Sequence, residues 1–143
     1  MKEYNFVNGY KIDKSEFNSW NIEKINLNKT KRRIFFKEGE IWWFSAGINI
    51  GEEVYGKGKN FRRPGLILKK LSSNTCIVIP TTTKEREGSW YYRINSANIG
   101  TWIFMLHQIR FVSANRLYVR ESTISSDDFI QIKKSLVNLL GLS

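Results

Sequence analysis

The sequence predicts an α+β domain that is mainly β, with five or six mostly antiparallel strands between an N-terminal and a C-terminal helix. Short apolar and aromatic runs recur between turn residues along the middle of the chain. Apolar residues at helical spacing occur near both ends. A chain of 143 residues, 41% of them hydrophobic, is long enough for one core. We expect a main domain at residues 37–143, after an extension at residues 1–36 that contains one helix.

The extension shows one clear signal. Residues 1–12 have no period, and we expect a loosely tied terminus there. Asp13, followed three residues later by Glu16, has the form of a capping box, and apolar residues at roughly helical spacing come after it. This pattern predicts a helix over about residues 13–29. The basic run at residues 29–33 is either a solvated linker end or a nucleic-acid contact.

Strand-like runs with turn residues between them make up the middle of the main domain. Pro64 disfavours helical geometry at Arg63, and the apolar run that follows has the length of a strand covered on both faces. Arg63 should therefore be held rigidly at the mouth of a buried strand. The predicted strands are Glu40–Ser45, Gly65–Leu68, Thr75–Ile79, Ser89–Ile94, one long strand over 101–112, and Leu117–Arg120.

The end of the chain predicts a second helix. Ser125 and Asp128 form another capping-box pattern, and Phe129, Ile132 and Leu136 recur at helical spacing before the glycine at position 141. The pattern is typical of an amphipathic helix that packs its apolar face on a sheet.

Residues 47–60 are glycine-rich and charged, which indicates a long hairpin loop between the first two strands. The segment from Gly51 to Lys57 matches the opening of a phosphate-binding P-loop. However, Gly58 stands where Ser or Thr would hold magnesium, and no helical pattern follows. We interpret the segment as a mobile loop beside the Arg63 strand, suited to contacting a substrate.

Composition limits the partners and the compartment. Lys and Arg number 23 against 13 acidic residues, a formal charge of +10, which favours a polyanion such as nucleic acid or an acidic protein segment. The single cysteine, Cys76, lies in an apolar run and indicates a buried residue in a reducing compartment. No apolar stretch approaches the roughly 20 residues of a membrane span, and the polar start lacks a signal-peptide core. We expect a soluble, cytoplasmic protein.

The residue types favour phosphate chemistry that needs no metal. One histidine, one cysteine and scattered acids give no ligand cluster, so we expect no metal and no cofactor. Arginine, threonine, histidine and glutamine at strand ends can cleave RNA, because the 2′-hydroxyl is an internal nucleophile and the protein supplies positioning, a proton acceptor and positive charge. His107 is the side chain suited to proton transfer near neutral pH. Strand alternation places it beside Ile109 and Phe111, so a half-buried structural role stays open.

Four segments of the chain occur in the order and spacing of one protein family, namely Gly39–Phe44, Arg62–Leu68, Ile79–Lys84 and Gln108–Leu117. On these segments, the chain resembles PemK/MazF toxins of type II toxin-antitoxin systems over about residues 37–140. The resemblance implies a small, twisted, barrel-like antiparallel sheet of the CcdB/PemK type, with a C-terminal packing helix and the extra N-terminal helix of extended members. It also implies a homodimer, a sequence-selective endoribonuclease that cleaves single-stranded mRNA, and a cognate antitoxin with an acidic tail.

The resemblance implies catalytic roles for Arg63 and Thr82, with Thr83 as the alternative threonine. Some members carry a catalytic aspartate where this chain has His107, so His107 or Arg110 is the candidate for proton transfer or charge neutralisation. Gly65 replaces a bulky apolar residue and predicts looser packing. The residues expected to bind RNA are Arg62, Lys57, Lys59, Lys84, Gln108 and Arg110. Two rival classes remain: a CcdB-like poison of DNA gyrase, and a noncatalytic module that binds RNA or operator DNA.

Overall fold

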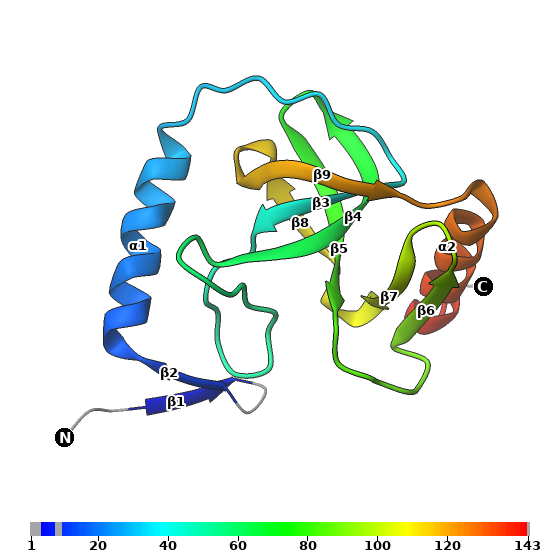
Figure 1. The fold of residues 1–143 in the computed structure, drawn as a ribbon, viewed down its shortest axis with the longest axis horizontal. Helices are drawn as coiled ribbons and strands as arrows, with labels where there is room; N and C mark the ends of the chain where they lie inside the picture. The colour runs from blue at the N-terminus through cyan, green and yellow to red at the C-terminus, as the bar shows by residue number, and fades with distance from the viewer. Residues whose placement is uncertain (1–3, 8–9, 143) are drawn as a thin grey trace.

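The computed structural model describes the backbone of residues 4–7 and 10–142. A mainly β, antiparallel body carries helix α1 at one side and helix α2 at the other (Figure 1), which confirms the predicted fold class. Along the chain the elements are β1 (Tyr4–Val7), β2 (Tyr10–Asp13), α1 (Lys14–Asn28), β3 (Glu40–Ser45), β4 (Arg62–Ser72), β5 (Thr75–Thr82), β6 (Tyr91–Ser96), β7 (Gly100–Met105), β8 (Arg110–Ser113), β9 (Leu117–Thr123) and α2 (Ser126–Leu140).

Strand β5 connects the two parts of the main sheet. The strands lie side by side in the order β6, β7, β5, β4, β3 and β9, and each neighbouring pair is antiparallel. The first half of β5, residues 75–78, also pairs with β8, whereas Thr81 and Thr82 at its end pair with β7. The polar end of β5 therefore lies where the two parts of the sheet separate.

The core occupies both faces of the sheet. On β4, Leu66 and Ile67 are each fully buried but belong to two different apolar clusters, as alternation along a strand requires. The same division separates Val78 from Ile79 on β5. The predicted strand covered on both faces is confirmed.

Helix α2 closes one of these clusters. The Ser125 hydroxyl accepts a hydrogen bond from the Asp128 amide at 3.1 Å, and Gly141 ends the helix in the left-handed region. Ile132 and Leu136 are buried against the cluster that contains Leu66. Both predicted ends of this helix are confirmed.

The N-terminal helix is docked on the rest of the protein. The Asp13 carboxylate accepts from the Glu16 amide at 3.1 Å, which confirms the predicted cap. Trp20 is only 5% exposed and contacts the edge of the Phe61 ring, with 5.5 Å between the ring centres. At the end of the helix, the side-chain amide of Asn115 donates to the Leu27 carbonyl at 3.0 Å. The apolar contact of Trp20 therefore joins α1 to the loop between β3 and β4.

Three expectations were wrong. A hairpin of β1 and β2 precedes the helix where no regular structure was expected, because strands of four residues are too short to show a period. The long strand over 101–112 is broken by a 3₁₀ turn at Leu106–Gln108, where the chain leaves one half of β5 for the other. Gly65 does not loosen the packing, because a Cβ there would lie 2.7 Å from the Phe44 ring.

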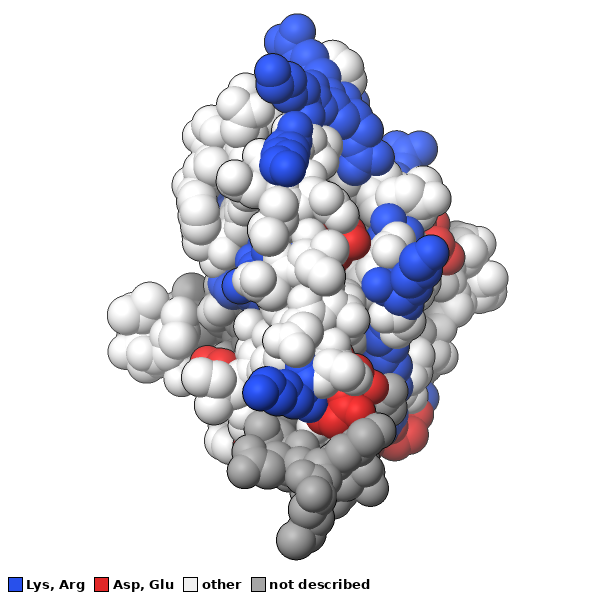
Figure 2. Space-filling view, turned by 90° about the vertical axis from the view of Figure 1, so that its left-hand side faces the viewer, with Lys and Arg blue, Asp and Glu red and all other residues white. Residues whose placement is uncertain are grey.

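The basic run at residues 29–33 lies in the linker that follows α1. Figure 2 shows Lys and Arg side chains gathered at this end of the α1 face, and few acidic residues beside them. Arg32 donates to the Leu117 carbonyl, and the Arg33 guanidinium lies 5.6 Å above the exposed Phe35 ring. Within the described residues, no helix is long and apolar enough to cross a membrane.

Alanine at Gly47 measures how closely Trp20 packs on the loop. Gly47 has a φ of 80°, and an added Cβ would lie 2.2 Å from Cζ2 of Trp20. Gly58 in the same loop has a φ of 77° with nothing within 4 Å of its Cβ position, so Gly58→Ala is the matched control. Both should lose about 1–2 kcal/mol of unfolding free energy to left-handed strain. Gly47→Ala should lose about 1–3 kcal/mol more through the clash. Equal losses in urea denaturation would contradict the contact.

Candidate active site

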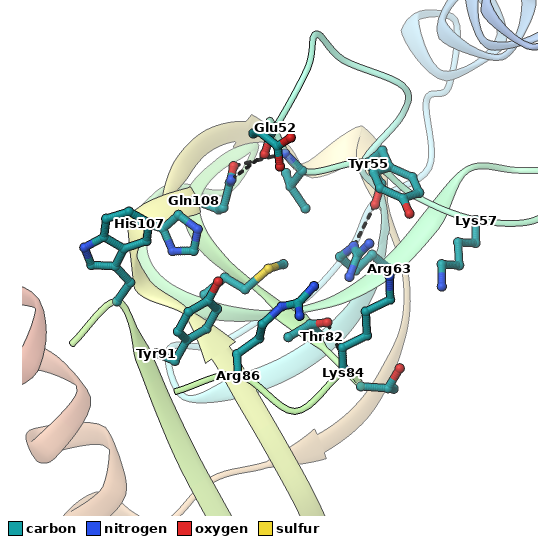
Figure 3. A pocket seen from close by; sticks show the side chains of 14 residues that line it. Glu52, Tyr55, Lys57, Arg63, Thr82, Lys84, Arg86, Tyr91, His107 and Gln108 are labelled. Atoms are coloured by element: carbon teal, nitrogen blue, oxygen red, sulfur yellow. Dashed lines mark hydrogen bonds between the residues drawn. The ribbon is translucent and has the colours of Figure 1, made fainter. Parts of the chain in front are cut away.

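One cavity collects most of the residues that the sequence selected. It has a volume of about 210 Å³ and lies between the ends of β4 and β5, the loop after β3 and the 3₁₀ turn at 106–108 (Figure 3). Seven of the ten selected residues line it, namely Lys57, Arg63, Thr82, Thr83, Lys84, His107 and Gln108.

Arg63 is held by two backbone carbonyls. Its Nε donates to the Tyr55 carbonyl at 2.6 Å, and its Nη1 donates to the Thr81 carbonyl at 2.8 Å. A guanidinium has five N–H groups, so three remain for a ligand. Burial lowers the pKa of Arg63 from its ordinary value, and the partial loss of water strengthens its attraction for an anion. The predicted rigid guanidinium is present at the mouth of β4.

The two threonines at the end of β5 have different surroundings. Thr81 is buried, and its hydroxyl donates to the Pro64 carbonyl at 3.0 Å, which joins β5 to β4. Thr82 lines the cavity, and its hydroxyl accepts from the Lys84 amide at 3.2 Å. Because an accepting hydroxyl still has its own proton to donate, Thr82 can bond to an oxyanion beside Arg63.

The lining has an excess of positive charge. Lys57, Arg63, Lys84 and Arg86 face the cavity, and Glu52 is the single acid among its described lining residues. Such a concave, cationic surface attracts phosphate groups and other anions. Across the described parts of the chain, no three His, Cys, Asp or Glu side chains lie together as a metal site would require.

Gln108 shapes the wall of the cavity. Its Oε1 accepts from the Val54 amide at 3.0 Å, and its Nε2 donates to the Glu52 carbonyl at 2.9 Å, as Figure 3 shows. Both polar ends of this side chain are therefore engaged by the loop. Gln108 fixes the loop rather than offering its amide to a ligand.

His107 lies in the 3₁₀ turn and is exposed, not half-buried on a strand as the alternation indicated. Its ring centre is 5.1 Å from that of Trp90 and 5.2 Å from that of Tyr91. Since it belongs to the cavity lining, its imidazole can reach a bound molecule.

Three of the selected cations lie outside the cavity. The Arg62 guanidinium stacks on the Tyr118 ring at 3.6 Å, and its Nε is buried without a hydrogen-bond partner among the described residues. Lys59 lines a separate hollow of about 580 Å³ between α1 and the loop. Arg110 donates to the Ala46 carbonyl at 3.2 Å, and burial lowers its pKa from the ordinary value.

Arg116 supports the same end of the loop as Arg110. Its Nη1 donates to the Ser45 carbonyl at 2.9 Å, and its guanidinium lies 5.5 Å from the centre of the Trp20 ring. Burial, with a smaller contribution from the charge of Arg110, lowers the pKa of Arg116 to about 10. These two arginines therefore stabilise the beginning of the loop through its first backbone carbonyls.

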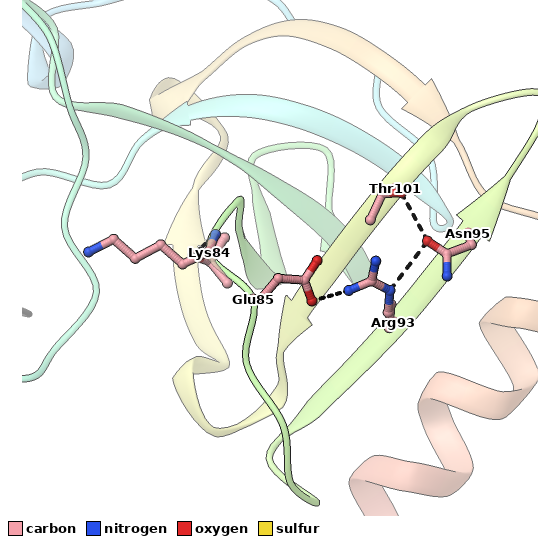
Figure 4. A network of polar contacts seen from close by, with 6 residues as sticks. Lys84, Glu85, Arg93, Asn95 and Thr101 are labelled. Carbon is pink, nitrogen blue, oxygen red and sulfur yellow. Dashed lines mark hydrogen bonds and ion pairs between the residues drawn. The ribbon is translucent and has the colours of Figure 1, made fainter.

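Sequence reasoning missed several lining residues. Arg86 and Trp90 come from the connection between β5 and β6. Arg86 lies in a charged turn that gives no period to indicate direction, and Trp90, which we expected in a strand beginning at Ser89, comes directly before β6. Tyr91 at the start of β6 also lines the cavity, whereas Arg93, two positions later, bonds to Glu85 and to Asn95 outside it (Figure 4).

A family model described as "PemK-like, MazF-like toxin of type II toxin-antitoxin system" matches residues 37–140. A search of curated protein sequences finds no match.

Solved structures of low sequence identity share the fold. MazF from Deinococcus radiodurans is 18% identical, with 76% of this chain and 98% of that chain covered and a TM-score of 0.63. An endoribonuclease in complex with its cognate antitoxin, from Mycobacterial species, is 14% identical, with coverages of 76% and 98% and a TM-score of 0.61. A MazE-MazF structure from Deinococcus radiodurans is 16% identical, with coverages of 77% and 100% and a TM-score of 0.57.

Gln108→Ala tests whether this side chain fixes the cavity wall. Loss of the bond from the Val54 amide should raise the hydrogen-exchange rate of that amide roughly three- to tenfold, since one hydrogen bond stabilises by about 1 kcal/mol. Gln131→Ala, at an exposed position of α2, is the matched control and should leave Val54 unchanged. Two-dimensional NMR measures the rates. An unaltered Val54 rate in Gln108→Ala would refute this role.

Proposed function

Because this chain belongs to the family of PemK-like, MazF-like toxins of type II toxin-antitoxin systems, we propose that it is an endoribonuclease that cleaves single-stranded RNA without a metal ion. One observation carries the proposal. Arg63, held by two carbonyls, and Thr82 line the same cationic cavity. A guanidinium and a hydroxyl at one anion site suit a phosphodiester group.

The chemistry follows from the substrate's own nucleophile. The ribose 2′-oxygen attacks the adjacent phosphorus and loses its proton, the bond from phosphorus to the 5′-oxygen breaks, and that oxygen takes up a proton. The products are a 2′,3′-cyclic phosphate and a 5′-hydroxyl. Arg63 stabilises the negative charge that gathers on the phosphoryl oxygens, and Thr82 donates a hydrogen bond to one of them.

His107 is the proposed proton acceptor. It is exposed in the cavity lining, whereas the alternative, Arg110, already donates to the Ala46 carbonyl outside the cavity. An imidazole exchanges protons near neutral pH, and a guanidinium does not. The other cations of the lining, Lys57, Lys84 and Arg86, bind the flanking phosphates.

Three further features belong to the proposal. Residues 37–143 form the toxin domain, and residues 1–36 are an extension whose helix α1 packs against it. The toxin acts as a homodimer, as the resemblance implies. A cognate antitoxin inhibits it with an acidic tail that competes with RNA for the cationic cavity, consistent with solved neighbours that are complexes of MazE with MazF.

Arg63→Ala should lower the cleavage rate of single-stranded RNA by about 10²- to 10³-fold or more, because the charge that stabilises the transition state is removed. Arg93→Ala is the matched control, because Arg93 bonds to Glu85 outside the cavity. This variant should cleave RNA at the wild-type rate. Cleavage is measured in chelator with mapped RNA ends, and circular dichroism checks folding. Arg63→Lys keeps the charge and should retain part of the activity.

Other outcomes of this experiment separate the rival functions. Folded wild-type protein that leaves RNA intact in chelator rules out the endoribonuclease. Inhibition of DNA gyrase under those conditions would support a CcdB-like poison. Salt-sensitive binding of uncut RNA or operator DNA would support a noncatalytic module.

A further inference from the structure

Two aromatic side chains of the cavity lining, Trp90 and Tyr91, have no role in the phosphate site or in the proton transfer. Both rings contact His107, with ring centres at 5.1 Å (Trp90) and 5.2 Å (Tyr91) from the imidazole. All three belong to the lining that also contains Arg63 (Figure 3). Flat rings and cations therefore share one concave surface.

Trp90 presents a large aromatic surface to solvent. It is 54% exposed, although its ring also contacts His107 at a tilt of 36°. Its backbone is fixed, because the Trp90 carbonyl accepts from the Leu106 amide at 2.8 Å and Tyr91 pairs with Met105. The two contacts hold Trp90 and the turn that carries His107 together. The exposed indole is thus presented from an anchored backbone.

An exposed indole beside cations has a specific use in binding single-stranded nucleic acid. Each nucleobase has an apolar face, and its phosphate carries the negative charge, so a binding surface combines aromatic rings with Lys and Arg. Here Lys84 and Arg86 come from the chain segment just before Trp90. A protein ligand with an acidic tail would use the same cations but would not require an anchored flat ring.

We propose that Trp90 is a nucleobase-binding site, on which one base next to the cleaved bond stacks while its phosphate contacts the cationic lining. The site rests on the proposed function and adds a contact that phosphate binding does not supply. Since Trp90 also contacts His107, a stacked base brings the ribose-phosphate backbone to the imidazole. Stacking is tolerant of base identity, so the site strengthens binding without selecting a sequence.

Two substitutions separate stacking from packing. Trp90→Phe keeps an aromatic face, whereas Trp90→Leu keeps apolar bulk against His107 but has no aromatic face. The matched control is Phe111→Ala, which removes an exposed aromatic ring of β8 outside the cavity. Trp90 is more than half exposed, so these variants should fold.

Binding is measured by fluorescence anisotropy with two probes of equal length. One is a 2′-O-methyl RNA of mixed sequence, which has no 2′-hydroxyl to attack its phosphates, and the other is the same backbone without bases. Wild-type protein should bind the first about tenfold more tightly, because stacking contributes roughly 1–3 kcal/mol per base. Trp90→Leu should lose this preference and keep its affinity for the baseless probe. Trp90→Phe and Phe111→Ala should retain the preference.

The nucleobase site is refuted if Trp90→Leu keeps the wild-type preference, or if it loses affinity equally for both probes. The second result would assign Trp90 a structural role only. Cleavage of unmodified RNA by the wild type is measured separately. A protein that prefers the probe with bases but cleaves nothing retains the nucleobase site and loses the proposed endoribonuclease.

Discussion

The guanidinium of Arg63, bonded to the carbonyls of Tyr55 and Thr81, connects three of the segments that enclose the cavity. Arg63 lies on β4, Tyr55 on the loop before it and Thr81 on β5. Two N–H groups of Arg63 donate to these carbonyls, and the two bonds fix the orientation of the three N–H groups that remain. One side chain therefore shapes the cavity and also supplies the least exposed cation of its lining.

The loop that carries Tyr55 is held on several sides, and the N-terminal extension is one of them. Trp20 of α1 packs on Gly47 and Phe61, at the two ends of the loop, and Phe61 has a positive φ that is unusual for a residue with a side chain. Such a conformation persists when surrounding contacts enforce it. Gln108 holds the middle of the loop. Helix α1 does not line the cavity, but its Trp20 packs against the loop that forms part of the cavity wall. The N-terminal extension is therefore linked to the site through this loop.

Local rules predicted the parts of the fold that depend on neighbouring residues. Asp13 and Ser125 cap their helices through bonds three residues away, and Pro64 restricts Arg63 directly, so each signal lies in the sequence itself. The break after Met105 could not be predicted, because Leu106 is as buried as a strand residue would be. Likewise, nothing in the run before Pro64 indicates that Arg62 stacks on Tyr118, a contact across 56 positions of the chain. For the same reason, Trp90 was not predicted as a site residue, since its neighbour His107 comes from another element.

The position of the phosphate that the proposed endoribonuclease would cleave can be observed directly. A crystal structure of the full chain with a single-stranded RNA whose reactive 2′-hydroxyl is replaced by hydrogen would show it. We expect one phosphate within hydrogen-bond distance of both the free N–H groups of Arg63 and the Thr82 hydroxyl, with the Arg63 bonds to Tyr55 and Thr81 still present. An RNA whose phosphates all lie away from this cavity, or an Arg63 that leaves both carbonyls to reach the phosphate, would contradict the site described above.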